Sequence, residues 1–335
     1  MTIFSKVLSS GLVLGCLVQT SLVVRAADNG GSGPLQFKFE LNHPVVFAAV
    51  STTRTTTDRT VQLDTGAKTA VSTNLVEMRY KLRLTPIRQL ADGAWTLHYE
   101  PFEFEEDLDT TANGGHVVTS IRGLDIKSTQ NGIVVVDTLK GLGLTQAKAY
   151  KQAVYTRLLN GYFDFQPNGV IAKVSGDLPF EDLWNESTKY QVGFFDIVFS
   201  ADPVPEGGSW NKVLALKDLE GIRLSEPGIM ETNTFVRQND AAATNHLVTV
   251  TVSMEVNPKN LQGNMDAMGQ YTALNISEYQ HQKTGKFLFD AEAGCLRKGD
   301  ETETAKLMLD MLVQGHMMTV STQLSIRSQF DLLSN

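Results

Sequence analysis

Six carboxylates within ten consecutive residues form a dense group of ionisable side chains. They are Glu100, Glu103, Glu105, Glu106, Asp107 and Asp109. Converging carboxylate oxygens are the ligands that a hard cation such as Ca2+ prefers, so Glu103, Glu105 and Asp107 are candidate metal ligands. Glu103 and Glu105 also alternate with Phe102 and Phe104, which is typical of a strand with one solvated face. The pattern therefore permits a metal site but favours acids that are simply exposed.

Asp64 is the candidate catalytic residue. The segment Asp64-Thr-Gly-Ala67 resembles the active-site loop of aspartic proteases, in which two carboxylates share one proton. The sequence contains no second Asp-Thr-Gly or Asp-Ser-Gly, so the resemblance implies a homodimer in which a second copy supplies the other carboxylate. The alternative interpretation is a turn between two Thr-rich strands, for which Asp and Gly are common residues.

Other motifs that could carry chemistry are fragments. Ser209-Trp-Asn-Lys212 and Lys283-Thr-Gly285 match two of the three motifs of penicillin-recognising enzymes, but the second is predicted to lie in a hairpin turn. Gly141-Leu-Gly143 lacks the third glycine of a dinucleotide-binding loop, and we expect no cofactor. No two histidines have the spacing of a metal site, so each is expected to be a surface or hydrogen-bonded residue. The histidines are His43, His98, His116, His246, His281 and His316.

The first 26 residues have the features of a secretory signal peptide. Lys6 supplies a positive charge, residues 7–24 are mostly apolar, and Val24-Arg-Ala26 fits a signal-peptidase site. Leu14-Gly-Cys16 resembles a bacterial lipobox and makes Cys16 a candidate lipidation site, although the residues after Cys16 stay apolar. Residues 27–34 are expected to form a flexible mature N-terminus. We therefore expect an exported, periplasmic or extracellular protein without a transmembrane span in its mature chain, with Cys16 as a candidate membrane anchor.

Composition limits the class of protein. The chain has 335 residues, of which 42% are hydrophobic and 20% charged, and its formal net charge is −8. This hydrophobic content can fill a folded core. A negative chain lacks the clustered Lys and Arg that nucleic-acid binding requires, so nucleic acid is not an expected partner. Two cysteines are too few for a disulfide framework.

Alternation of apolar and polar residues predicts that strands dominate. Between residues 76 and 84, apolar side chains alternate with Glu77, Arg79, Lys81 and Arg83. Residues 318–326 alternate equally regularly. This pattern is typical of antiparallel strands with one buried face. Asp92-Gly93 predicts a hairpin turn between two of them.

The predicted fold is a β-rich α+β protein with two curved, half-barrel-like antiparallel sheets and one or two packed helices. One helix is expected from Gln146 to Leu159 and a second from Pro179. Prolines and glycines between residues 201 and 210 interrupt regular structure and suggest a linker. We therefore expect an N-terminal β-rich domain at residues 35–200, which holds the helices, and a C-terminal antiparallel β domain at residues 211–335.

Three short segments together resemble an uncharacterised family of bacterial secreted or lipoprotein envelope proteins, catalogued only as a domain of unknown function. They are Phe165–Gly176, Pro203–Trp210 and Gly285–Asp290, the last leading to Gly294. The resemblance implies a β-rich body behind a signal peptide or lipobox. It brings no known catalytic residues, so it implies no particular chemistry.

Apolar and aromatic residues at alternate positions could line one concave face of a sheet. Methionine, which adapts its shape to apolar ligands, is frequent late in the chain. A curved sheet with such a face is suited to holding a lipid or another apolar molecule. Because no catalytic set converges, the pattern favours a non-enzymatic envelope carrier of an apolar ligand. The alternatives are a structural or protein-interaction module on the cell surface, with an envelope protein as its partner, and an aspartic-type hydrolase built on Asp64.

Overall fold

The computed structural model describes most of the chain after the N-terminal segment. The described residues are 17–18, 34–157, 160–176, 197–216, 218–219, 222–225, 228–238, 246–259, 261–267, 270–313 and 315–334. The expected signal peptide, apart from Leu17 and Val18, and Cys16 lie outside these ranges, as does the second helix expected from Pro179. Among the described residues, no helix has the length and apolar character that a membrane crossing requires.

Strands make up almost all of the described structure. Their bounds are β1 (Leu17–Val18), β2 (Val45–Leu63), β3 (Gly66–Gln89), β4 (Trp95–Ala112), β5 (Gly115–Arg122), β6 (Asp125–Gln130), β7 (Ile133–Asp137), β8 (Gly161–Phe165), β9 (Ile171–Gly176), β10 (Ser209–Leu216), β11 (Asp218–Leu219), β12 (Ile222–Leu224), β13 (Ile229–Arg237), β14 (Leu247–Val256), β15 (Leu261–Ala267), β16 (Gln270–Asp290), β17 (Cys295–Val313) and β18 (His316–Ser334). A 3-10 turn, η1 (Thr138–Lys140), precedes the described α-helix, α2 (Leu144–Arg157).

The expectation of an α+β fold with two sheets is wrong. The strands form one antiparallel sheet in which β18 pairs with β2 along almost their whole lengths, from Met318 opposite Val61 to Ser334 opposite Val46. This pairing joins the last strand of the chain to the first long one, and such non-local pairing leaves no trace in local sequence patterns. The 201–210 segment therefore does not separate two sheets, and its last two residues already belong to β10.

Individual elements follow the sequence pattern closely. In β3, Tyr80, Leu82 and Leu84 are buried as the alternation predicts, and the turn at Asp92-Gly93 joins β3 to β4. The Asp92 carboxylate accepts a hydrogen bond from the Ala94 backbone N–H at 3.1 Å, which holds this turn. The helix predicted from Gln146 to Leu159 is confirmed as α2, shifted by two residues toward the N-terminus.

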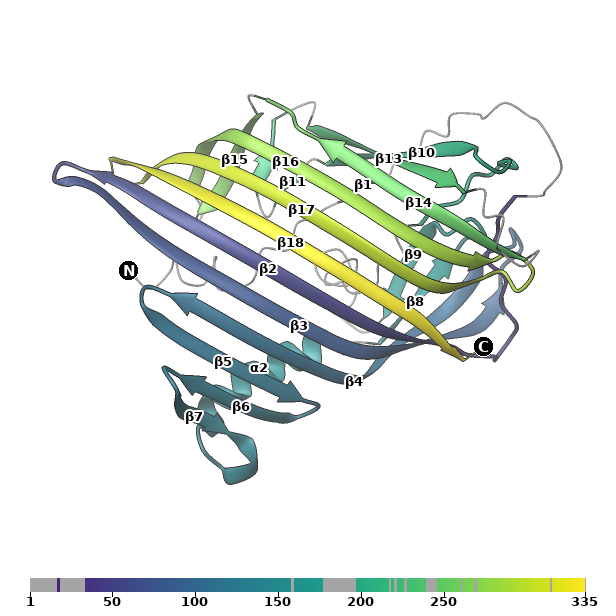
Figure 1. Cartoon of the computed structure of the whole chain (residues 1–335), viewed down its shortest axis with the longest axis horizontal. Coiled ribbons are helices and arrows are strands. Elements are labelled where there is room, and N and C mark those ends of the chain that lie inside the picture. The colour runs from purple at the N-terminus through teal and green to yellow at the C-terminus, as the bar shows by residue number, and fades with distance from the viewer. Residues whose placement is uncertain are drawn as a thin grey trace.

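The sheet curls so that β8 and β9 lie behind the long strands, and β13, with β10 beside it, continues the sheet from β14 (Figure 1). We call the face turned toward this interior the inner face. At one end it carries an aromatic cluster, formed by Phe37, Phe47, Phe163, Phe165, Phe199, Trp210, Phe235, Phe287, Phe289 and Phe330. Rings from both halves of the chain meet here, so the two predicted domains share one core.

Two segments outside the sheet complete the aromatic cluster. Phe37, from the segment before β2, lies with its ring centroid 5.0 Å from Phe165 and 5.4 Å from Phe289. Phe199 lies 4.7 Å from Phe289. Gly169 and Gly294, both with positive φ, allow these segments to approach. A Cβ on Gly169 would lie 2.3 Å from the Ile197 carbonyl oxygen, and one on Gly294 would lie 2.5 Å from the Lys38 side chain.

At the other end of the long strands, the inner face carries an aliphatic cluster. Its members are Leu216, Ile222, Leu224, Ile229, Met254, Val256, Leu274, Ile276, Ala305, Leu307, Leu309, Met311, Met318, Val320, Leu324 and Ile326. The buried alternation predicted for residues 318–326 is confirmed, because Met318, Val320, Leu324 and Ile326 all belong to it. The two clusters differ in composition: the first combines these rings with aliphatic residues, whereas the second is almost entirely aliphatic, with Tyr279 as its aromatic member.

Candidate ligand-binding face

A group of buried polar residues separates the two apolar clusters on the inner face. We call it the charged cluster, and it consists of Glu231, Tyr279, His281, Lys283, Glu301 and Glu303. Its position follows from strand alternation. In β16, Tyr279, His281 and Lys283 lie between Ile276 of the aliphatic cluster and Phe287 of the aromatic cluster, on the same face. In β17, Glu301 and Glu303 precede Ala305 in the same way.

His281 is held between two carboxylates. Its Nδ1 lies 2.6 Å from Glu231 Oε1, and its Nε2 lies 2.7 Å from Glu303 Oε1. The side chains of His281, Glu231 and Glu303 are only 9%, 6% and 11% exposed. The Tyr279 hydroxyl donates a further hydrogen bond to Glu231 Oε1 at 3.1 Å. Both ring nitrogens are therefore occupied by acceptors, which requires a doubly protonated, positively charged imidazole.

A second ion pair adjoins this triad. Lys283 Nζ lies 3.2 Å from Glu301 Oε1, and both side chains are buried. Lys283 stands opposite Glu303 across β16 and β17, so the two pairs form one connected patch. With His281 charged, three carboxylates face two cations. Because buried charges are stable only when they are paired, this patch must fold as a unit.

The protonation of His281 depends on its partners. Burial by itself would lower the pKa of His281. The hydrogen bonds to Glu231 and Glu303, together with the charges of these carboxylates, outweigh burial and raise the pKa to about 10. His281 is therefore a positively charged imidazolium at neutral pH, and it lies between the negatively charged carboxylates of Glu231 and Glu303.

This raised pKa predicts a pH dependence of stability. An unfolded histidine has a pKa of about 6.5. Below that value both states carry the proton, and the full stabilisation is present. Between about pH 6.5 and pH 10 the folded protein holds the extra proton, so the free energy of unfolding should fall as pH rises, by at most about 1.4 kcal/mol per pH unit. Urea unfolding at a series of pH values from about 6 to 9, followed by tryptophan fluorescence, measures this slope.

The variant His281→Gln is the control for this prediction, because it removes the titrating group while keeping a polar side chain. Its free energy of unfolding should be lower at pH 6 and should vary less with pH than that of the wild type. Equal slopes in the two proteins would show that His281 is not the titrating group.

The charged cluster does not have the geometry of a metal centre. Glu231 and Glu303 lie on opposite sides of the imidazole, so their oxygens do not converge on one point. In the part of the chain that the structure describes, no group of three His, Cys, Asp or Glu side chains could hold a metal ion. The arrangement instead fixes a strip of charge between two apolar surfaces. The charged cluster therefore marks the boundary of the neighbouring aliphatic cluster.

The aliphatic cluster lies next to the charged cluster on the inner face. Met254, Met311 and Met318 lie among leucine, isoleucine and valine side chains from β14, β17 and β18. Methionine side chains repack easily around apolar partners of irregular shape. An apolar surface with a polar boundary is the typical composition of a lipid or small-molecule site.

Asp64 lies in the turn that follows β2, three residues beyond Val61, which packs against the aliphatic cluster. Asp64 and Thr65 form the two-residue turn between β2 and β3, where Leu63 pairs with Gly66, and Asp64 is exposed. Figure 1 shows this hairpin extending beyond its neighbours at one end of the sheet. The structure thus places the candidate catalytic residue at an exposed tip, and its catalytic role stays a prediction.

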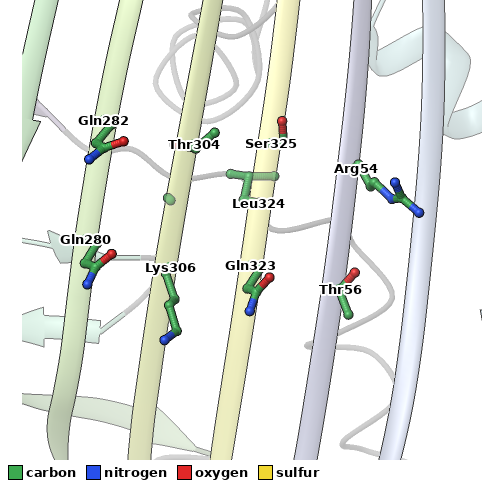
Figure 2. Close-up of a pocket in the computed structure, with 10 residues that line it drawn as sticks. Arg54, Thr56, Gln280, Gln282, Thr304, Lys306, Gln323, Leu324 and Ser325 are labelled. Atoms are coloured by element: carbon green, nitrogen blue, oxygen red, sulfur yellow. The ribbon is translucent and has the colours of Figure 1, made fainter.

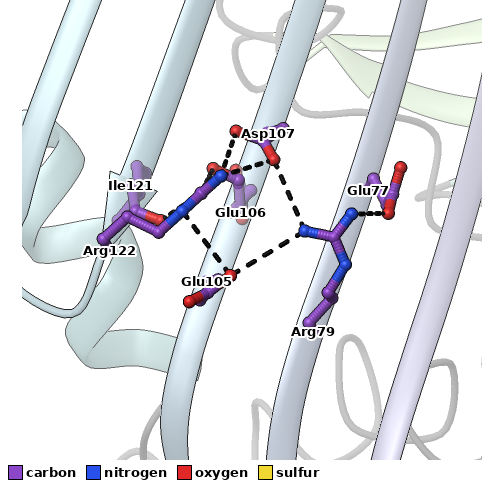
Figure 3. A network of polar contacts seen from close by, with 7 residues as sticks. All are labelled: Glu77, Arg79, Glu105, Glu106, Asp107, Ile121 and Arg122. Carbon is purple, nitrogen blue, oxygen red and sulfur yellow. Dashed lines mark hydrogen bonds and ion pairs between the residues drawn. The ribbon is translucent and has the colours of Figure 1, made fainter.

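The candidate metal ligands Glu103, Glu105 and Asp107 face cations from neighbouring strands. Figure 3 shows Glu105 and Asp107 with Arg79 and Arg122. Arg122 donates two hydrogen bonds to Asp107, at 2.9 and 2.8 Å, and its Nε lies 3.5 Å from Glu105. Arg79 lies 3.8 Å from both Glu105 and Asp107. The hydrogen bonds from Arg122 lower the pKa of Asp107. Glu103 pairs with Lys81. These acids form an outer-face ion-pair network in which arginine and lysine balance the charge.

Glu106, which belongs to the same run of acids, lies on the inner face instead of the outer face. Glu103 has a positive φ of 50°, and the β3–β4 register shifts between Arg79 and Lys81. This bulge changes the alternation of β4, so Phe104 and Glu106 are buried on the inner face, whereas Phe102 lies under the Arg83 guanidinium at 4.7 Å. The expectation that Phe102 and Phe104 share one face is therefore wrong.

A shallow depression of about 490 Å3 lies on the outer face across β16, β17, β18 and β2 (Figure 2). Its lining is polar: Arg54, Thr56, Gln280, Gln282, Thr304, Lys306, Gln323 and Ser325, with Ala305 and Leu324 beneath. Lys306 forms an ion pair with Glu278 at 2.6 Å. The depression lacks the apolar walls that an apolar ligand requires, so it is not the site that the sequence predicts.

Sequence reasoning missed the charged cluster. His281 is hydrogen-bonded, which is one of the two environments expected for it, but its two carboxylate partners were not predicted. The expectation that Lys283 lies in a hairpin turn is wrong, because Lys283 is buried in the middle of β16. The alternation contains the necessary information. Counting back in twos from the buried Phe289 and Phe287 places Gly285, Lys283 and His281 on the inner face. Counting back from Leu309 and Leu307 does the same for Glu303 and Glu301.

The comparisons with known proteins leave the family open. The chain matches no protein-family model and no curated protein. Among solved structures, it is similar to the P. putida toluene transporter TodX at 8% identity, over 87% of this chain and 91% of that one, with a TM-score of 0.19. The CymD monoaromatic hydrocarbon channel gives 9% identity over 89% and 90% of the two chains, with a TM-score of 0.16. These scores are too low to establish a common fold. The candidate site is therefore argued from the geometry of this chain alone.

Proposed function

We propose that this protein is an exported envelope protein that binds an apolar ligand on the inner face of its curved sheet. The observation that carries the proposal is the aliphatic cluster, a group of buried leucine, isoleucine, valine and methionine side chains on the inner face that ends at a strip of buried charge. The aromatic cluster, by contrast, is filled by Phe37 and Phe199 from the chain itself. Only the aliphatic end has the adaptable composition that a lipid-like ligand needs.

The cellular location is part of the proposal. The first 26 residues have the charge, apolar stretch and cleavage site of a signal peptide, and Cys16 provides a candidate lipid anchor. A carrier in the cell envelope would transfer apolar molecules through an aqueous space. The resemblance to a secreted or lipoprotein envelope family supports the same location.

Native mass spectrometry tests the proposed function. We expect the protein, purified gently from its own cell envelope, to carry a small apolar molecule that organic extraction removes. The variant Leu309→Asn should reduce the bound fraction by about tenfold, because an unpaired amide on an apolar surface is costly. Met308→Asn, on the outer face of the same strand, is the matched control and should bind like the wild type. A protein that carries no apolar molecule, and binds none of a panel of added lipids, would rule the carrier out.

A further inference from the structure

Arg59 occupies an unusual place for an arginine. In β2 it stands opposite Val320 of β18 and Ala70 of β3. Directly opposed residues of antiparallel strands share a face, so Arg59 lies on the inner face, beside an aliphatic-cluster residue. Val61, two residues further along the strand, packs against the same cluster. Arg59 therefore lies at the edge of the aliphatic cluster, on the side remote from the charged cluster.

No residue that the structure describes pairs with the Arg59 side chain. It is half-buried, and within the described residues it makes no hydrogen bond and no ion pair. Burial lowers its pKa, and no carboxylate opposes this effect. Asp58, the adjacent acid in the sequence, points to the outer face because side chains alternate along the strand. Removing a guanidinium from water without an anionic partner costs free energy, so this position favours an anion that arrives from outside.

A second cation lies next to Arg59. Lys68 of β3 stands opposite Val61 of β2, on the same face, and it is exposed. On adjacent strands, Arg59 and Lys68 are diagonal neighbours, at a spacing of about 7–8 Å that long side chains span. Two cations thus border the aliphatic cluster at the β2–β3 end of the sheet.

We propose that Arg59, assisted by Lys68, binds the carboxylate of a long-chain fatty acid whose acyl chain lies along the aliphatic cluster. The proposal rests on the proposed function and names its ligand class. A guanidinium binds the two oxygens of a carboxylate through two parallel hydrogen bonds, which suits a ligand with one charged group. The apolar surface that begins at Val61 and Val320 then receives the chain. Phospholipid is the competing occupant, and the experiment separates the two.

Calorimetric titration of the delipidated protein with palmitate and with hexadecanol tests the proposal, because the two ligands share their chain and differ in charge. We expect palmitate to bind at least about tenfold more tightly than hexadecanol. Arg59→Gln should weaken palmitate binding by about tenfold and leave hexadecanol binding unchanged. Arg59→Lys should restore part of the loss. The matched control is Arg54→Gln, which removes an arginine from the exposed outer face of the same strand and should change neither affinity.

The outcomes separate this proposal from the proposed function. Equal binding of palmitate and hexadecanol by the wild type would overturn the role of Arg59 while leaving the apolar carrier in place. Binding of neither ligand, and of no other lipid, would overturn both. Tighter binding of phosphatidylglycerol than of palmitate would overturn the fatty acid as the ligand. If Arg59→Gln does not fold, Lys68→Gln tests the same headgroup contact from an exposed position and should weaken palmitate binding selectively.

Discussion

Replacing His281 by alanine should lower the free energy of unfolding by about 3–5 kcal/mol at neutral pH, because the replacement leaves two buried carboxylates without their cation. In the wild type, Glu231 and Glu303 each lie within 2.7 Å of a ring nitrogen. Without His281 these carboxylates repel one another and must either take up protons or admit water. Urea unfolding followed by tryptophan fluorescence, to which Trp210 of the aromatic cluster contributes, gives the difference.

A neutral triple variant is the control for this loss. Glu231→Met, His281→Leu and Glu303→Leu together remove the three charges and replace them with apolar groups of similar size. Replacing a buried ionic group as a whole is often neutral or stabilising, so the triple variant should be clearly more stable than His281→Ala. If it were as unstable as the single variant, the loss would come from packing at position 281 and not from unpaired charge.

Replacing Phe37 by alanine is the second change with a large expected effect. The Phe37 ring contacts the rings of Phe165, Phe199 and Phe289. Truncating such a buried ring costs about 3–5 kcal/mol, because the transfer free energy is lost and a cavity remains. The Phe37 backbone N–H also donates to the Pro167 carbonyl at 2.7 Å, so we expect the segment before β2 to become a site of proteolysis as well.

Phe39→Ala tests whether this effect depends on burial. Phe39 belongs to the same segment but is only half-buried, with its ring 6.2 Å from Trp95 and 5.8 Å from Phe165. It should cost about half as much as Phe37→Ala, because less apolar area leaves water at this position. Limited proteolysis and urea unfolding of both variants measure the two effects. Equal losses would mean that the segment is held by its backbone contacts and not by the Phe37 ring.

The charged cluster shows what a single sequence reveals about a site and what it hides. Alternation alone places His281 and Lys283 on the inner face of β16, and Glu301 and Glu303 on that of β17. It cannot show that Glu231 reaches His281, because β13 and β16 are not neighbours in the sheet and β14 lies between them. The Glu231 contact depends on the strand order, and the strand order is set by hydrogen bonds between distant segments.

The bulge in β4 illustrates a second limit. The alternation of residues 102–105 predicts that Phe102 and Phe104 share a face, and Glu106 is expected to be exposed with the other acids, whereas it is buried. A single residue with positive φ, Glu103, shifts the strand by one position and reverses the side on which the following residues lie. Glutamate is not a residue type that marks such a conformation, so no local pattern predicts the bulge.

The sequence by itself determined the strands at residues 76–84 and 318–326 with their buried faces, the first helix and the turn at Asp92-Gly93, because these depend on side-chain periodicity and on local backbone preferences. Only the tertiary structure decided that there is one sheet and not two, that β18 pairs with β2, and that Arg59 meets the aliphatic cluster. Those features depend on which distant strands form hydrogen bonds with one another. Backbone N–H and C=O groups are alike in every residue except proline, so their partners are chosen by the packing of the whole chain and not by the residues that carry them.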